Sequence, residues 1–577
     1  MAPAAPRPRA SPADHAGRRT RARPASAASA GRRWRRKGNR RAGPSFPCRA
    51  TRRCAISRES ACGSTSGLAN VLFITADQWR GDTLSAVGHP CIRTPVLDAL
   101  AGEGTLFRRH YTVAYPCGPS RASLLTGLYP HTHRSVRNGT PLDARHSNLA
   151  LEVRRGGWDP LLFGYTDTSL DPRGRAPDDP ARHSYEGVAP GFTPVLNLSE
   201  SSRAWIADLI AKGYDVPAPG EGREPLYDPD PAAEAAPGGF GPTRIRAEDS
   251  ETAFMTDQVL RHLAVLQGKP WFAHLTYICP HPPFAAPAPW HRAYDPVAMP
   301  APLRGPTAAE EGSQHPLLAG LHRAVRLDKF LNHAEGPASA LDAAGVAAVR
   351  AAYYGLASEV DHHLGRVFEF LKASGQWDDT LIVFTSDHGE QLGDHYLFGK
   401  LGYFDQPAHI PLIVRDPRPE SDAGRGRQVD DFTESVDIMP TILGWLGLPV
   451  PRHCDGGSLL PFCAGGRPPD WRDAAHWFYD FGNVRERVGA ARLHADQCGV
   501  QVIRDARRKY VHCTALPPLF FDLERDPGEF EDRSRDPAYA AEMLAYAQKL
   551  LSWRMRHEDR TLSHITLEGG YFEEAAR

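Results

Sequence analysis

Short apolar runs alternate with longer amphipathic stretches along most of the chain. Runs rich in β-branched and aromatic residues predict strands buried on both faces at residues 70–76, 271–277, 381–386 and 410–415. The amphipathic stretches predict helices over residues 94–104, 249–267, 346–374 and 432–446. Alternation of this kind is typical of an α/β sheet flanked by helices.

The pattern changes after about residue 466. Strand-like runs lie at residues 477–479, 500–503, 509–511 and 519–523. One amphipathic helix is expected after them, at residues 538–557. These elements predict a small antiparallel sheet with a C-terminal helix. Two stretches crowded with Pro, Gly and charged residues, 172–248 and 299–335, are expected to be long excursions that cover or shape a site. We therefore expect a main α/β domain over 70–465 and a smaller α+β subdomain over 466–577.

Composition separates residues 1–69 from the rest. They hold sixteen Arg and one Lys against Asp14 and Glu59, so this leader carries +15 and the remainder −15 in a chain of zero formal charge. With few aliphatic residues beyond Ala, the leader is expected to be disordered. A transit-like peptide, a basic arm for nucleic acid or membrane, and translation from a start codon placed too early remain open, the last being favoured. The acidic body is not expected to bind nucleic acid.

The cysteines and the hydropathy bear on compartment. The ten cysteines form no CxxC pair, which indicates neither a zinc site nor a disulfide framework. No stretch approaches 18 uninterrupted apolar residues and no apolar signal segment is present, so neither a transmembrane helix nor membrane association is expected. These features predict a cytoplasmic protein.

The run from Cys117 to Gly127, CGPSRASLLTG, is the strongest chemical signal. A cysteine just before Pro119 and an apolar run should lie at a helix N-terminus, where free N–H groups and the dipole attract an anion and lower a thiol pKa. Arg121 would hold the nucleophile or an anionic oxygen with forked donors. A buried structural cysteine near a helix start is the alternative.

Two carboxylates stand where predicted strands end. Asp77 follows the strand at 70–76, and Asp387 follows the strand at 381–386 with His388 beside it. Ligands of open α/β sheets bind outside the carboxyl ends of strands, so the three side chains suit a cation. A capping turn is the alternative interpretation for Asp387 to Glu390.

Together, the Cys117 run, Asp77 and Asp387 resemble the type I sulfatases of the alkaline phosphatase superfamily. Most sulfatases have Asp-Asp and many have Asp-Asn where this chain has Asp77-Gln78 and Asp387-His388. The chain is more similar to the phosphonate monoester hydrolase and phosphodiesterase subgroup from residue 70 nearly to its end. The resemblance implies a large mixed sheet sandwiched by helices and the oxidation of Cys117 to formylglycine by a formylglycine-generating enzyme.

The resemblance also implies one divalent metal ion. Its expected ligands are Asp77, Gln78, Cys117 as formylglycine, Asp387 and His388. An imidazole donor suits Mn²⁺, Fe²⁺ or Zn²⁺ better than Ca²⁺, which prefers oxygen. Manganese is the first choice, and the other three ions remain open.

Further roles come from the same resemblance. Arg121 and Lys400 would neutralise charge in the transition state, and His281 would protonate or hydrogen-bond the leaving oxygen. A rigid loop histidine and a surface lysine are the alternatives for the last two. Asn138, Tyr165 and Asp167 would bind substrate, although an ionised Asp167 would repel an anion unless it turned away.

The substrate class is inferred from a basic motif that common sulfatases have and this chain does not. Common sulfatases carry Lys-x-His where this chain has Tyr165-Thr166-Asp167, and losing that positive charge favours a singly charged ester. We expect a metal-dependent hydrolase of phosphonate monoesters and phosphodiesters that also accepts sulfate esters. An arylsulfatase or other sulfuric ester hydrolase, and an unconverted binding homologue, are the alternatives. The family's habit and the aromatic C-terminal helix, with Tyr546 and Trp553, predict a homo-oligomer, expected to be a tetramer.

Overall fold

A computed structural model describes residues 69–574 except for positions 200, 219–221, 562, 564, 569 and 570. The predicted leader, residues 1–69, therefore lies outside the described residues apart from Ala69. Within the described part of the chain, no helix combines the length and the apolar character needed to cross a bilayer.

An eight-stranded mixed sheet forms the centre of the fold. Its order is β11 (Arg427–Val429), β2 (Thr105–Phe107), β10 (Leu412–Arg415), β8 (Thr380–Thr385), β1 (Asn70–Ala76), β7 (Phe272–Tyr277), β5 (Pro160–Gly164) and β6 (Thr193–Asn197). Strands β8, β1, β7, β5 and β6 run parallel, whereas β10 is antiparallel to β8 and β2. The large mixed sheet confirms the expected fold class.

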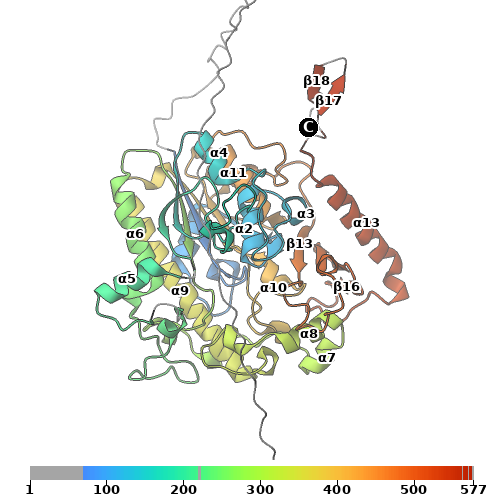
Figure 1. The fold of residues 1–577 in the computed structure, drawn as a ribbon, viewed down its shortest axis with the longest axis horizontal. Helices are drawn as coiled ribbons and strands as arrows, with labels where there is room; N and C mark the ends of the chain where they lie inside the picture. Colours follow the sequence, from blue (N-terminus) through green and yellow to red (C-terminus); the bar gives the residue numbers. More distant parts are fainter. Residues whose placement is uncertain are drawn as a thin grey trace, which may run out of the picture. The chain divides into compact units, whose positions relative to one another are not determined.

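Both faces of the sheet are buried, as the apolar strand at 70–76 predicts. Leu72 and Ile74 of β1 belong to one apolar cluster and Val71 and Phe73 to another, because successive side chains of a strand point to opposite faces. The first cluster includes side chains of α1 (Pro95–Glu103), α6 (Glu251–Val265) and α9 (Ala343–Ala373). The second includes α2 (Cys117–Thr126), α4 (Leu149–Arg155) and α11 (Ile438–Trp445), so helices enclose the sheet from both sides (Figure 1).

A second sheet includes the predicted C-terminal strands. Its order is β16 (Leu519–Asp522), β15 (Arg508–Cys513), β14 (Gly499–Arg504), β13 (Ala475–Asp480) and β4 (Ala114–Tyr115). The first four are antiparallel neighbours, as expected, but β4 comes from the N-terminal half and pairs parallel with β13. Because β4 ends two residues before Cys117, this sheet supports the start of α2. The expected domain boundary at residue 466 stays a prediction.

Three local expectations need correction. The 172–248 stretch is not only an excursion, because it supplies strand β6 and helix α5 (Arg203–Ala211). Pro411 has no N–H for a sheet ladder, and the strand expected at 410–415 is divided into β9 (His409–Ile410) and β10. The helix expected from 432 begins at Ile438, after β12 (Thr433–Glu434) and a 3₁₀ turn.

The aromatic residues of the C-terminal helix α13 (Ala540–Arg556) pack inside the chain. Trp553 stacks on His476 with ring centroids 4.2 Å apart and meets Tyr129 edge-on at 4.6 Å. Tyr546 donates a hydrogen bond to Asp505 and packs on Phe520. These two side chains are thus used within one chain, and the expected homo-oligomer stays a prediction.

Candidate active site

The predicted site residues converge at the carboxyl ends of four adjacent parallel strands. Asp77 follows β1, Asp387 follows β8, His281 lies four residues beyond β7, and Tyr165 follows β5. Cys117 opens helix α2 and faces this edge of the sheet, with Sγ 3.2 Å from His388 Nε2. Alternation of strands and helices brings these distant positions together, because the carboxyl ends of parallel strands share one edge.

Cys117 lies at the predicted helix N-terminus, but its acidity differs from the expectation. Burial, reinforced by the charges of Asp77 and Asp387, raises the pKa of the Cys117 thiol well above its ordinary value. The expected lowering of this pKa by the helix terminus is wrong, because desolvation and nearby carboxylates outweigh the dipole. An unmodified Cys117 is therefore a neutral thiol at physiological pH and a weak nucleophile.

Arg121 is the cation around which the carboxylates gather. Its guanidinium is 1% exposed and donates to Asp77 Oδ2 at 2.9 Å through Nη2 and to Asp387 Oδ2 at 3.1 Å through Nε. The same Nε lies 3.8 Å from Asp167 Oδ2. Tyr165 adds a hydroxyl donor to Asp77 Oδ2 at 2.7 Å, and its ring faces the guanidinium at 4.4 Å. We call Arg121, Asp77, Asp167 and Asp387 the Arg121 cluster.

The Arg121 cluster holds more negative than positive charge. Burial and the charge of Asp77 raise the pKa of Asp387 to about 6, although Arg121 opposes the shift. Burial works against ionisation of Asp77 as well, but His281 and Arg121 hold its pKa well below the usual range. Burial also raises the pKa of Asp167 to about 7. Three carboxyl groups around one guanidinium create a demand for a further cation.

The residues present fit a divalent cation. One ligand atom each from Asp77, Cys117, Asp387 and His388 lies within 4.8 Å of the others, and all four residues are buried. Asp77 Oδ1 is buried without a hydrogen-bond partner, which is costly unless a cation satisfies it. His388 Nδ1 donates to the Gly389 carbonyl at 3.1 Å, which leaves the lone pair of Nε2 facing the cluster. Burial lowers the pKa of His388 to about 3 and so keeps this ring neutral.

Gln78 links the cluster to Lys400. Its Oε1 accepts a hydrogen bond from Lys400 Nζ at 2.5 Å, and its Nε2 donates to Glu390. Glu390 Oε1 also accepts from the backbone N–H groups of Leu392 and Gly399. Glu390 thereby fixes which end of the Gln78 amide faces the cluster and holds the segment that carries Lys400.

The three expected substrate-binding residues line one cavity with Cys117. We call it the site cavity; it has a volume of about 320 Å³ and is also lined by Asp77, His281 and Lys400. Asn138 Oδ1 accepts a hydrogen bond from the Gly118 N–H at 2.9 Å. The amide Nδ2 of Asn138 takes no part in this bond and can donate to another group. Asp167 is 8% exposed and has a φ of 44°, a left-handed conformation that is uncommon away from glycine and recurs at functional sites.

His281 lines the same cavity as a neutral ring. Its Nδ1 donates to the Pro282 carbonyl at 2.8 Å, so the neutral ring has an unprotonated Nε2. Burial and the charge of Lys400 lower the pKa of His281 to about 3. His281 is therefore an acceptor at Nε2, and it becomes a proton donor only when a nearby anion raises its pKa.

Two contacts that build the site could not be read from the sequence motifs. Ser120 donates through Oγ to the backbone carbonyl of Asp387 at 2.5 Å, which ties helix α2 to the end of β8. Its position between Cys117 and Arg121 was the available signal. The sequence also carries no sign of the bond between Glu390 and Gln78.

Comparisons with known proteins define the class. The chain matches the profile of the Sulfatase family over residues 69–448 and that of the N-sulphoglucosamine sulphohydrolase C-terminal region over residues 393–556. The chain belongs to the sulfatase family, within the alkaline phosphatase superfamily, and is a hydrolase that acts on ester bonds. This family implies a divalent metal ion and a formylglycine made from cysteine, and Cys117 lies in the candidate metal site.

Particular relatives narrow the comparison. The multifunctional alkaline phosphatase superfamily protein PehA of Trinickia caryophylli is 47% identical over 504 residues, which cover 86% of this chain and 97% of that protein. The phosphonate monoester hydrolase structure from Agrobacterium radiobacter superposes with a TM-score of 0.83 at 45% identity, covering 88% of this chain and all of the other. That from Silicibacter pomeroyi gives 0.81 at 42% identity, covering 88% and 99%. An arylsulfatase of Clostridium perfringens is 26% identical over 87% of this chain and 97% of its own length.

Proposed function

We propose that this protein hydrolyses phosphonate monoesters and phosphodiesters, and sulfate esters to a lesser extent, with a formylglycine made from Cys117. The observation that carries the proposal is the charge around Cys117. Arg121 and Lys400 face Asp77, Asp167 and Asp387, and the segment from Tyr165 to Asp167 contains no cation. Because carboxyl groups outnumber cations around Cys117, the site is expected to attract a singly charged ester better than a doubly charged one.

Manganese(II) is the proposed metal, held by Asp77, Gln78, the hydrate of residue 117, Asp387 and His388. Oxygen donors with one imidazole suit Mn²⁺ or Fe²⁺, whereas Ca²⁺ prefers oxygen alone. When bound, such an ion polarises a non-bridging oxygen of the ester and favours ionisation of the hydrate. The unpartnered Asp77 Oδ1 supports an ion at this position.

The side chains then divide the reaction between them. One hydrate oxygen of residue 117 attacks phosphorus or sulfur, and Arg121 and Lys400 neutralise the charge that develops. His281 takes a proton at Nε2 once the anion is present and passes it to the leaving oxygen. The second hydroxyl of residue 117 afterwards gives its proton to water and becomes the aldehyde C=O, the carbon–oxygen bond to the phosphoryl or sulfuryl group breaks and releases the product, and a water molecule restores the hydrate.

Further substrate contacts come from the part of the site cavity that Asn138, Tyr165 and Asp167 line. Asn138 offers its Nδ2 to a non-bridging oxygen, since its Oδ1 already accepts the Gly118 N–H. Tyr165 stiffens this wall through Asp77 and Arg121, and a protonated Asp167 donates to the ester.

Maturation and surroundings are also proposals. A formylglycine-generating enzyme acts on Cys117, the protein works in the cytoplasm, and it assembles as a homo-tetramer. The outward apolar side chains Leu544, Leu551 and Met555 of α13, each more than half exposed, support an association surface.

The test compares two chromogenic esters with one leaving group. We expect kcat/KM for 4-nitrophenyl phenylphosphonate to exceed that for 4-nitrophenyl sulfate by about tenfold or more. A large preference for sulfate would favour the arylsulfatase alternative, which the similarity to the Clostridium arylsulfatase supports. No hydrolysis of either ester by protein with a converted Cys117 would contradict both.

A further inference from the structure

A second cavity of about 270 Å³ lies beside the site cavity. Its walls bring together segments far apart in the sequence: Pro116 before α2, Leu401 after Lys400, and Tyr479 and Val484 from the end of β13 and the loop beyond it. We call it the Val484 cavity. Its size is just below the range for small-molecule sites, which begins at about 300 Å³.

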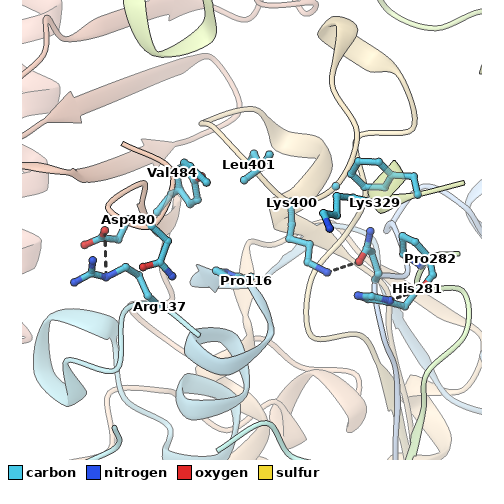
Figure 2. A pocket seen from close by; sticks show the side chains of 14 residues that line it. Pro116, Arg137, His281, Pro282, Lys329, Lys400, Leu401, Asp480 and Val484 are labelled. Carbon is cyan, nitrogen blue, oxygen red and sulfur yellow. Dashed lines mark hydrogen bonds and ion pairs between the residues drawn. The ribbon is translucent and has the colours of Figure 1, made fainter. Parts of the chain in front are cut away.

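The Val484 cavity is mainly apolar between two polar ends. Val484 and Leu401 lie on one side and Pro116 on the other, whereas Lys400 and His281 stand at one end (Figure 2). At the other end Arg137 Nε lies 3.5 Å from Asp480 Oδ1. Between the two ends the lining is apolar, so this part of the cavity favours an uncharged apolar group, whereas Lys329 and Lys400 lie at the end shared with the site cavity.

The two cavities share a wall that contains catalytic groups. His281, Lys329, Lys400 and Phe330 line both, whereas Cys117, Asn138 and Tyr165 line only the site cavity. A reacting phosphorus or sulfur atom must lie near residue 117, hence in the site cavity. The organic part that extends past His281 and Lys400 enters the Val484 cavity.

In-line displacement decides which organic part this is. The leaving oxygen stands opposite the attacking oxygen, so it points away from residue 117. His281, Lys400 and Lys329 are the groups at the boundary that can donate a proton or a hydrogen bond to that oxygen. The group bonded to the leaving oxygen therefore continues beyond them, and the retained group stays with Asn138 and Tyr165.

We propose that the Val484 cavity is the leaving-group subsite and takes an uncharged aromatic alcohol of one or two rings. This inference rests on the proposed ester hydrolysis and names its substrate class more narrowly. Flat rings fit against Pro116, Tyr479 and Val484, and each buried Å² of apolar surface contributes about 25 cal/mol. Expulsion leaves the alcohol with its proton on oxygen, supplied through His281.

The first test fills the cavity. Val484→Trp is expected to lower kcat/KM for 4-nitrophenyl methylphosphonate and 4-nitrophenyl phenylphosphonate at least tenfold more than for their 2,2,2-trifluoroethyl analogues. Asp328→Trp is the matched control, because Asp328 is exposed and lines only the site cavity. In Asp328→Trp the loss of kcat/KM should depend on whether the retained group is methyl or phenyl, and not on which alcohol leaves.

Losses in Val484→Trp that follow the retained group, or that are equal for all four esters, would overturn the proposal. If the wild-type protein with formylglycine cleaved none of the esters, the proposed function would fail instead. A binding measurement separates the two cases and also guards against misfolding. Calorimetry with 2-naphthol on unconverted Cys117→Ala protein should detect binding, and Val484→Trp in that background should weaken it at least tenfold. Equal binding to both proteins would contradict the subsite.

Discussion

Two buried charged clusters in this molecule are built from similar side chains and serve different ends. In the second sheet, Lys509 is fully buried and its Nζ lies 2.6 Å from both carboxylate oxygens of Glu529 and 2.7 Å from Asp405 Oδ1. Arg504 adds a second cation at 2.9 Å from Asp405. We call these four residues the Lys509 network. Its two cations and two carboxylates balance, which is what a buried structural ion cluster requires.

The Arg121 cluster lacks that balance. Even with the nearby Lys400 counted beside Arg121, two cations face the three carboxyl groups of Asp77, Asp387 and Asp167, and one oxygen of Asp77 has no hydrogen-bond partner. Its carboxyl pKa values are also spread apart, with Asp77 well below the usual range, Asp387 at about 6 and Asp167 at about 7. Both clusters are buried, so burial of charged groups does not by itself indicate a functional site in this molecule. An excess of buried negative charge beside an open cavity does indicate such a site.

Asp77→Asn should give the largest effect. It removes a proposed metal ligand and one negative charge, so we expect less than a tenth of the wild-type metal content by elemental analysis and roughly a 10³-fold loss of kcat/KM. The metal-free variant should melt within a few degrees of the metal-free parent. Wild-type metal content in the variant would remove Asp77 from the ligand set.

Lys509→Met tests the other cluster. Breaking a buried network by removing one partner leaves uncompensated carboxylates, and we expect a loss of about 3–5 kcal/mol in the free energy of unfolding by denaturant titration. Metal content per folded molecule should not change. A variant as stable as the parent, or one that folds but loses metal, would show that the two clusters do not differ as described.

Glu390→Gln is expected to weaken metal binding by about 10–100-fold, because Glu390 orients the amide of Gln78. Competition with a chelator measures this affinity directly. Glu311→Gln is the matched control, since Glu311 is a buried glutamate that pairs with His395 at 2.6 Å outside the site. Equal weakening in both variants would indicate general loosening and not a positioning role.

Asp167→Asn should give the smallest effect, visible in the pH profile. Burial raises the pKa of Asp167 to about 7, so the group is neutral below that pH and anionic above it. An anionic Asp167 repels an anionic ester, and kcat/KM should fall roughly tenfold as pH rises from 6 to 8. The asparagine variant should lose this decline. A profile that keeps the same decline would assign it to another group.

Part of this comparison could be predicted from the sequence. Asp77 and Asp387 end apolar strands and Cys117 opens a helix, so their convergence follows from the geometry of parallel sheets. Pairing between β4 and β13 could not be predicted, because two residues carry no periodic signal and their partner lies far along the chain. The raised pKa of Cys117 was missed for a related reason. Burial and neighbouring charge depend on the tertiary structure, which outweighed the local helix terminus.

The bond between Gln78 and Glu390 shows the same limit at the level of single contacts. The two residues stand more than three hundred positions apart and meet only because β1 and β8 are neighbours in the sheet. The Val484 cavity likewise combines β13 with the segment before α2. Residue types at strand ends were predictable, whereas contacts between segments far apart in the sequence were not.

The most direct test of the central claim is the mass of the Cys117 peptide, measured on the batches used for kinetics. We predict that coexpression with a formylglycine-generating enzyme turns the side-chain CH₂SH into an aldehyde, and that kcat per molecule rises in proportion to the converted fraction. Cys513→Ser, at a buried cysteine away from the site, should leave this relation unchanged. Full activity in protein that carries only the thiol at Cys117 would contradict the account.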